Sequence, residues 1–178
     1  YLRETANLVF HFALVGILLG LALGTGFKYQ GQRVLVEGQT FTNQLTSYDS
    51  FNPGRFFTDS SLEPYSLTLN DFTPTYQFDF TSGFANPLDF VADMTLTDSE
   101  GARDIALRVN QPLDHDGTSV YLLGNGFAPW ITVYSPAGDV VFSQPVAFLP
   151  QDSNLTSLGV VKIPDGLPSQ LGMIGFFY

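Results

Sequence analysis

The uncharged stretch TANLVFHFALVGILLGLALGTGF, from Thr5 to Phe27, determines how this chain is built. It contains 23 residues and lies between Glu4 and Lys28. The apolar core of a bilayer is about 30 Å thick, and an α-helix of about 20 residues spans it. A secretory signal peptide, with an apolar part of about 7–15 residues, is the competing interpretation. The length of the stretch, with no clean Ala-x-Ala site after it, predicts a retained transmembrane helix. Because the sequence begins without methionine, we expect a piece of a longer protein.

Composition limits the functions that the chain can have. Its 178 residues include no cysteine, two histidines, 7 basic and 17 acidic residues, and the formal net charge is −10. Binding to nucleic acid needs clustered basic residues, so that class is excluded. A chain without cysteine has no disulfide, no thiolate zinc site, no iron–sulfur cluster and no cysteine nucleophile. From residue 28 on, six residues are basic and sixteen are acidic, so the net charge lies after the helix.

The remainder of the chain is predicted to form β-structure. Apolar residues alternate with polar ones at 65–70, 76–81, 90–96 and 105–109, and turn signals rich in Gly and Pro separate these stretches. Short strands at this spacing predict an all-β domain, either an antiparallel sandwich or a partly closed barrel. We expect a transmembrane helix with its flanks at residues 1–29 and an extracytoplasmic β domain at 30–178. The predicted core is Phe78, Phe80, Phe90, Met94, Leu107, Val120, Leu122 and Val133.

The polar motifs in the β domain indicate turns and not metal-binding or catalytic sites. The segment Asp114-His115-Asp116-Gly117 contains carboxylates and an imidazole, but neighbouring residues in one tight loop rarely converge on a metal ion. We predict a turn there and a solvated hairpin end around Asp98. No serine lies in a nucleophile-elbow motif. The sequence therefore assigns no catalytic residue.

The predicted helix has two distinct faces. At about 100° per residue, Glu4, Asn7 and His11 lie within roughly 60° of one another. The opposite face presents two overlapping G-x-x-x-G steps, which permit a second helix to approach closely or reflect only the general frequency of glycine in membrane helices. The two faces together predict a helix packed inside a bundle. The glycines of the second face are Gly16, Gly20 and Gly24.

The histidine inside the apolar stretch is the main functional candidate. His11 lies about six residues, or roughly 9 Å, from the start of the uncharged run. A titratable side chain at that depth is costly and therefore a functional candidate. From the residues alone, two interpretations remain open: a neutral histidine that hydrogen-bonds to a neighbouring helix or to the interface, and a ligand of a haem or metal ion.

The residues around this histidine resemble a known family. Arg3 to His11, RETANLVFH, followed by an apolar Gly-rich helix, is similar to the third membrane helix of ResB-type cytochrome c biogenesis proteins. The resemblance continues in order along nearly the whole chain. It is carried by YQG at 29–31, VEG at 36–38, YDSF at 48–51, VNQPL at 109–113, GTSVYL at 117–122, GFAP at 126–129, FLPQD at 148–152 and GVVKIPD at 159–165.

The resemblance implies a function. ResB proteins are one half of the system II apparatus, which carries haem across the bacterial cell membrane and supports its attachment to apocytochrome c outside. The partner is a ResC/CcsA-type membrane protein with a Trp-rich haem-binding segment. The resemblance implies that His11 is an axial ligand of a haem shared with that partner. Because Glu4 and Asn7 lie on the same helix face, we expect them to orient the imidazole or to meet polar haem groups. It also implies a multi-pass full-length protein with the β domain on the outer face.

Several features depart from the family or leave alternatives. Trp130 is the one tryptophan, so the outer haem site of the apparatus cannot be built from this chain. Gln111 carries no haem role in our interpretation. The chain is expected to be a non-catalytic subunit, or one half, of the haem-transport and cytochrome c synthase complex. The competing hypothesis is a membrane-tethered β-sandwich that binds a ligand or scaffolds an envelope complex without haem. The polar stripe at Glu4, Asn7 and His11 favours haem, because a simple tether needs no buried polar residues.

Overall fold

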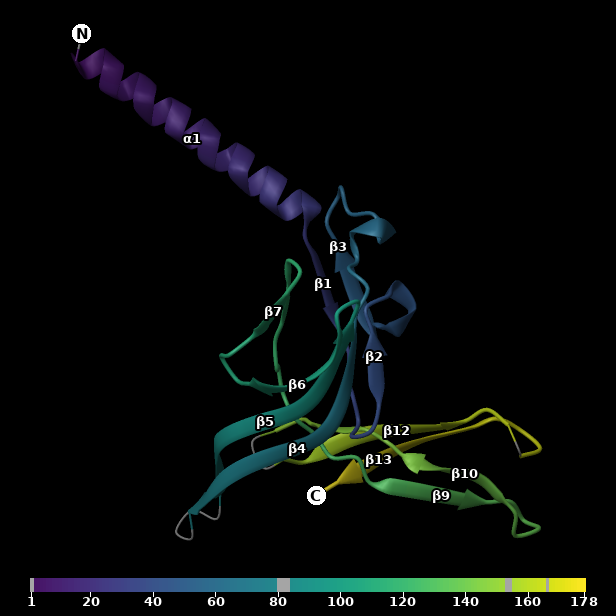
Figure 1. Cartoon of the computed structure of the whole chain (residues 1–178). Coiled ribbons are helices and arrows are strands. Elements are labelled where there is room, and N and C mark those ends of the chain that lie inside the picture. Colours follow the sequence, from purple (N-terminus) through teal and green to yellow (C-terminus); the bar gives the residue numbers. More distant parts are fainter. Residues whose placement is uncertain (1, 80–83, 153–154, 166) are drawn as a thin grey trace. The chain divides into compact units, whose positions relative to one another are not determined.

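The computed structural model describes residues 2–79, 84–152, 155–165 and 167–178. One apolar helix is followed by several small antiparallel β-sheets, which confirms the predicted class (Figure 1). Short 3-10 turns lie at Leu45–Ser47 and Asp59–Ser61. The helix and strands are α1 Leu2–Phe27, β1 Tyr29–Gln32, β2 Thr40–Thr42, β3 Ser50–Pro53, β4 Ser66–Asp79, β5 Phe84–Asp98, β6 Gly101–Arg108, β7 Leu113–His115, β8 Thr118–Val120, β9 Trp130–Tyr134, β10 Val140–Pro145, β11 Phe148–Pro150, β12 Ser157–Ile163 and β13 Leu171–Phe177.

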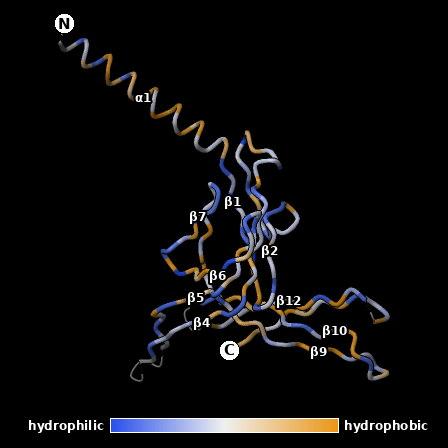
Figure 2. The backbone as a smooth tube through the Cα atoms, in the orientation of Figure 1, coloured by the Kyte–Doolittle hydropathy of each residue, from blue (hydrophilic) through white to orange (hydrophobic). Residues whose placement is uncertain are grey.

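Helix α1 contains the predicted membrane span. Residues Glu4–Phe27 form a 24-residue segment long and apolar enough to cross a bilayer. Hydrophobic residues recur along the length of the helix (Figure 2). Every described residue of the span up to Thr25 is exposed, which suits a surface that lipid or other helices cover, and only Gly26 near its end is buried. The chain is a membrane protein with this one candidate span among its described residues.

The residues group into two compact units. Unit 1 comprises Tyr1–Arg33 and Asn43–Pro64, and unit 2 comprises Val34–Thr42 and Tyr65–Tyr178. Unit 1 therefore joins α1 to the two-stranded β1–β3 sheet, while unit 2 contains the remaining sheets. The division into a helical segment at 1–29 and one β domain at 30–178 stays a prediction.

Unit 1 carries a two-stranded sheet whose first strand begins two residues after α1 ends. Strands β1 and β3 pair antiparallel, from Tyr29 opposite Pro53 to Gln32 opposite Ser50. Four aromatic rings pack in this unit with centroids 5.0–5.6 Å apart, and they belong to Tyr29, Tyr48, Phe51 and Phe57. Aromatic pairs of this kind supply apolar burial that a sheet of two four-residue strands could not obtain alone.

Unit 2 is organised around a four-stranded sheet in the order β2-β4-β5-β6. Alternate side chains of the long β4–β5 pair point into its core, as the period-2 pattern predicts, with Leu67 opposite Leu96 and Leu69 opposite Met94. Leu96 is 0% exposed. A second sheet, β11-β12-β13, buries its own apolar side chains on one face. The pairs β7–β8 and β9–β10 complete the unit.

The predicted core residues have mixed outcomes. Met94 and Leu107 are buried, as predicted. The prediction is wrong for four residues that are only half-buried, because most lie in or beside two-stranded pairs that offer little cover: Phe90, Val120, Leu122 and Val133. Phe80 and the side chain of Phe78 lie outside the described part of the chain.

Candidate functional site

Helix α1 places His11 so that its ring is held by the helix backbone. The Nδ1 atom lies 2.8 Å from the carbonyl oxygen of Asn7, one turn earlier. A carbonyl oxygen only accepts, so in this bond Nδ1 is the donor. The ring of Phe10 meets the imidazole edge-on, with centroids 5.5 Å apart. Two contacts from the helix itself therefore fix the direction of the imidazole.

This hydrogen bond decides which nitrogen is free for chemistry. In a neutral imidazole one nitrogen carries the proton and the other keeps a lone pair. Because Nδ1 donates to Asn7, the lone pair is on Nε2, at the outer end of the ring. His11 is exposed on the described chain, so this nitrogen points away from the helix toward lipid or a neighbouring protein. Metal-binding histidines commonly have this arrangement, in which a carbonyl holds one nitrogen while the other binds the metal.

The other two residues of the polar stripe contribute less directly. The helix confirms that Glu4, Asn7 and His11 share one face. Asn7 contacts the imidazole through its backbone carbonyl, not through its side chain. Glu4 is exposed one turn closer to the N-terminus. The expected roles of Glu4 and of the Asn7 amide toward a ligand stay predictions.

The glycine face is open. A methyl group built on Gly16, Gly20 or Gly24 would meet nothing within 4 Å in the described chain. These glycines therefore relieve no crowding inside the chain itself. The absence of side chains instead leaves a groove where the backbone of another helix can approach closely. The prediction that this face forms a helix–helix contact stays open.

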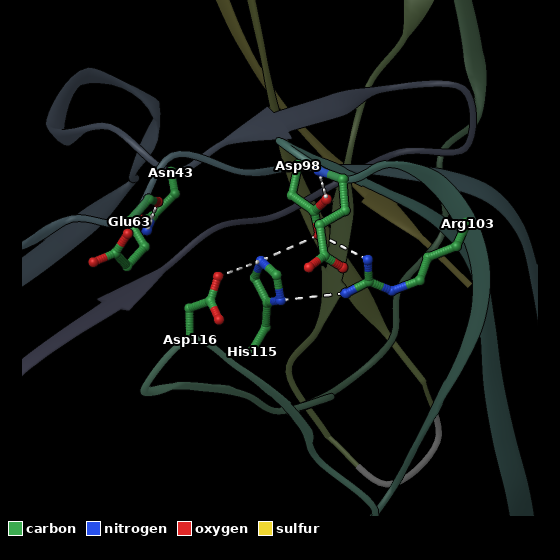
Figure 3. Close-up of polar contacts among 7 residues, drawn as sticks. Asn43, Glu63, Asp98, Arg103, His115 and Asp116 are labelled. Atoms are coloured by element: carbon green, nitrogen blue, oxygen red, sulfur yellow. Dashed lines mark hydrogen bonds and ion pairs between the residues drawn. The ribbon is translucent and has the colours of Figure 1, made fainter.

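The second histidine lies in a polar cluster of unit 2, formed by Asp98, Arg103, His115 and Asp116 (Figure 3). Arg103 donates from Nη1 to the carboxylate of Asp98 at 2.7 Å and from Nη2 to Nδ1 of His115 at 3.3 Å. The Nε2 atom of His115 lies 3.6 Å from carboxylate oxygens of both Asp98 and Asp116. Tyr65 covers the ring edge-on at 5.2 Å.

This His115 cluster has no position left for a ligand. Both ring nitrogens face protein groups, and the side chains of His115 and Asp98 are only 8% and 5% exposed. The backbone N–H of Glu100 donates to Asp98, and together with Arg103 it lowers the pKa of the Asp98 carboxyl against the opposing effect of burial. Within the described ranges, no group of three His, Asp or Glu side chains could hold a metal ion. The cluster therefore ties two hairpins together.

The predicted turn at Asp114-His115-Asp116-Gly117 is confirmed. β7 and β8 form a hairpin with Asp116 at φ 44° and Gly117 at φ 78°, two positive values that a tight hairpin turn requires. The predicted solvated hairpin end is wrong for Asp98, whose side chain is buried. The signal that could have revealed this was Arg103, because a cation five residues after Asp98 can fold back across a two-residue turn.

Comparisons with known proteins give one match. The chain matches the ResB-like family over residues 1–178. No curated protein matches it, and no solved structure matches it.

Proposed function

The chain belongs to the ResB-like family, whose role is in cytochrome c biogenesis, and we propose that its part in that process is to hold haem within the membrane. In this proposal His11 is one axial ligand of a haem that passes from the inner to the outer face. Haem is here the cargo of the protein, and its iron is the group that the imidazole binds.

The observation that supports this role is the state of the His11 ring. The bond from Nδ1 to the Asn7 carbonyl keeps the proton on the inner nitrogen and presents the Nε2 lone pair outward. Imidazole nitrogen is a common axial ligand of haem iron, and a hydrogen bond to the opposite nitrogen orients the ring. Coordination would also compensate the cost of placing an imidazole among lipid chains.

The side chains near His11 on α1 fit the rest of a haem molecule. Leu8, Val15 and Leu18 are apolar and exposed, so they would cover the porphyrin ring. Glu4 and Asn7 lie on the same helix face as His11, toward the N-terminal end, where polar parts of the haem could meet them. The helix thus offers apolar cover beside the imidazole and polar groups at one end.

Helix α1 supplies one axial ligand, so the proposal requires a second ligand from elsewhere in the complex. His11 is the one histidine of α1, and the chain contains no cysteine. We propose that a ResC/CcsA-type membrane protein supplies the second axial ligand and packs against the glycine face at Gly16, Gly20 and Gly24. The open space beside these glycines supports this packing.

The β-rich part would then work outside the membrane. We propose that the full-length protein is multi-pass in a bacterial cell membrane, with the β-sheets on the outer face where apocytochrome c receives haem. We propose that this chain supports the attachment reaction by presenting haem to the apocytochrome. The reacting cysteines belong to the apocytochrome.

The test is His11→Gly in the complex with the partner, purified in detergent and compared with the unsubstituted complex by absorption spectroscopy. We expect the Soret band and the reduced α and β bands to shift or weaken, because iron loses one strong ligand. Added imidazole should partly restore the original spectrum by entering the space that the side chain leaves. His115→Gln is the matched control and should leave the spectrum unchanged.

An unaltered spectrum in His11→Gly would contradict the proposal. His11 would then be a packing residue. A complex that lacks haem in every variant, including the unsubstituted one, would favour the alternative of a membrane-tethered scaffold or ligand-binding protein.

A further inference from the structure

A loop remote in sequence from α1 is bonded to the end of that helix. The backbone N–H of Gly54 donates to the carbonyl of Lys28, and the N–H of Phe56 donates to the carbonyl of Gly26, both at 2.8 Å. The ring of Phe56 lies over Gly26, with its centroid 5.2 Å from that of Phe27. We call residues 54–57, which follow β3, the interfacial loop.

The contact is close enough to require glycine on both sides. A Cβ on Gly26 would meet the Phe56 ring at 2.6 Å, and a Cβ on Gly54 would collide with the carbonyl oxygens of Thr25, Gly26 and Lys28. The loop therefore lies directly against the last turn of the helix. The bond from Phe56 uses the Gly26 carbonyl in the last turn of α1, which would otherwise lack a partner within the helix, and the bond from Gly54 holds the residue directly after it.

The depth of the loop in the membrane follows from these bonds. The candidate span ends at Phe27, and Gly26 is inside it. Because the helix rises about 1.5 Å per residue, a group bonded to Gly26 lies within a few ångströms of the end of the span. Phe56 must therefore lie at the boundary between acyl chains and headgroups whenever α1 crosses a bilayer.

The side chains at this place match the chemistry of that boundary. Phe27 and Phe56 are 62% and 50% exposed, a costly arrangement in water. Lys28 and Arg55 are exposed cations beside them, and neither forms an ion pair with any described residue. Aromatic rings at the headgroup level, with Lys or Arg next to them, are typical of segments that contact lipid at a membrane surface.

We propose that the interfacial loop, together with Phe27 and Lys28, is a second membrane contact that binds phospholipid. The rings of Phe27 and Phe56 enter the outer part of the acyl-chain layer, and Lys28 and Arg55 bind headgroup phosphates. This contact would fix the direction in which unit 1 leaves the bilayer. The inference rests on the membrane span and not on haem, so its outcome is separate from that of the His11 proposal.

The test measures the depth of position 56 in the full chain in lipid nanodiscs. Phe56→Trp is made in a Trp130→Phe background, so that one tryptophan reports, and its fluorescence is quenched with lipids that carry a nitroxide high on the acyl chain. The matched control is Leu45→Trp, in the same unit but beyond the opposite end of the β1–β3 pair. The length of the paired strands separates the two positions by roughly 10 Å.

We expect strong quenching at position 56 and little at position 45. Replacing phosphatidylcholine with phosphatidylglycerol as the nitroxide lipid should increase quenching at position 56, and Lys28→Gln with Arg55→Gln should remove that increase. Equal weak quenching at both positions would overturn the proposal. A blue-shifted but unquenched Trp at position 56 would also overturn it, because protein would then cover the loop.

A second measurement keeps the inference testable if tryptophan distorts the loop. Since the chain has no cysteine, Arg55→Cys and Leu45→Cys each accept a single spin label. At position 55, the label should collide more often with oxygen, which concentrates in lipid, than with a water-soluble nickel complex. At position 45, it should collide more often with the nickel complex than with oxygen. The reverse order would contradict lipid contact at the loop.

Discussion

Helix α1 and unit 2 each contain one histidine, and the two side chains meet opposite surroundings. His115 has protein groups at both ring nitrogens and is almost fully buried. His11 has one nitrogen held by its own helix, while the other faces outward from an exposed surface. A histidine whose contacts are complete stabilises the fold, whereas one with a free lone pair in a membrane span is suited to an external ligand.

The two compact units also differ in their net charge. Unit 1 has four basic and four acidic residues, whereas unit 2 has three basic and thirteen acidic residues. Unit 2 carries the whole net charge and builds its own core, as a water-exposed body does. Unit 1 is neutral overall and exposes apolar side chains along α1 and at Phe56. Such an exposed apolar surface suits contact with lipid or with other helices.

The largest difference between unit 2 and α1 should appear in the free energy of unfolding when an apolar side chain is truncated. Leu96→Ala should lower the free energy of unfolding by about 2–5 kcal/mol, because it removes a buried side chain and leaves a cavity. Chemical denaturation followed by far-UV circular dichroism measures the change. Leu18→Ala is the control in α1, where the side chain is 64% exposed, and it should leave the unfolding of the β-structure nearly unchanged. An equal loss of unfolding free energy in both variants would contradict the distinction between a buried core in unit 2 and an exposed helix surface.

Association should show the next largest effect, this time in the helix. Gly20→Leu should reduce recovery of the partner in detergent several-fold, because the added side chain keeps the two backbones apart. Leu21→Phe adds volume about 100° away around the helix and serves as the control. Unchanged recovery with Gly20→Leu would mean that the glycine face contacts lipid.

Acid should affect unit 2 through Asp98. The folded protein lowers the pKa of this carboxyl below its ordinary value of 3.8, so folding is favoured while the group is ionised. That stabilisation is present above the ordinary value and is lost as pH falls through the lower pKa of the folded state. Asp98→Asn should therefore unfold more easily near neutral pH and show a shallower loss of stability below about pH 4. Urea unfolding measured at several pH values tests this, and parallel curves for the two proteins would contradict it.

The smallest effect is expected at Asn7. Asn7→Ala keeps the backbone carbonyl that holds the His11 ring, so the haem content and spectrum of the complex should change little. Comparing the haem content of this variant with that of the unsubstituted complex tests whether Asn7 acts through its backbone carbonyl or through its side-chain amide. A large loss of haem would show that the Asn7 amide itself meets the ligand.

Local patterns predicted much of this structure. The uncharged run predicted α1, and the alternation in β4 and β5 identified strands whose inward side chains, such as Leu67 and Met94, are buried. Both are properties of neighbouring residues along the chain. The helix also confirmed the common face of the polar stripe, since that face depends only on the helical repeat.

Contacts between distant segments could not be predicted in this way. The pairing of Asp98 with His115 requires two separate hairpins to meet, and neither hairpin's sequence encodes the other's position. The bonds from residues 54 and 56 to the end of α1 likewise depend on how β3 returns beside β1. The proton position on His11 could be inferred only from the distance between Nδ1 and the Asn7 carbonyl oxygen, which the sequence does not give.

The most direct test of the contrast between the two histidines is the amount of haem bound per complex in His11→Gly and in His115→Gln. Both variants are purified with the partner, and haem is quantified as its pyridine complex against protein concentration. We expect a large loss of haem for His11→Gly and an unchanged ratio for His115→Gln, even if the latter is less stable. Full haem occupancy in His11→Gly, or an equal loss in both variants, would contradict the assignment of the membrane histidine as the haem ligand.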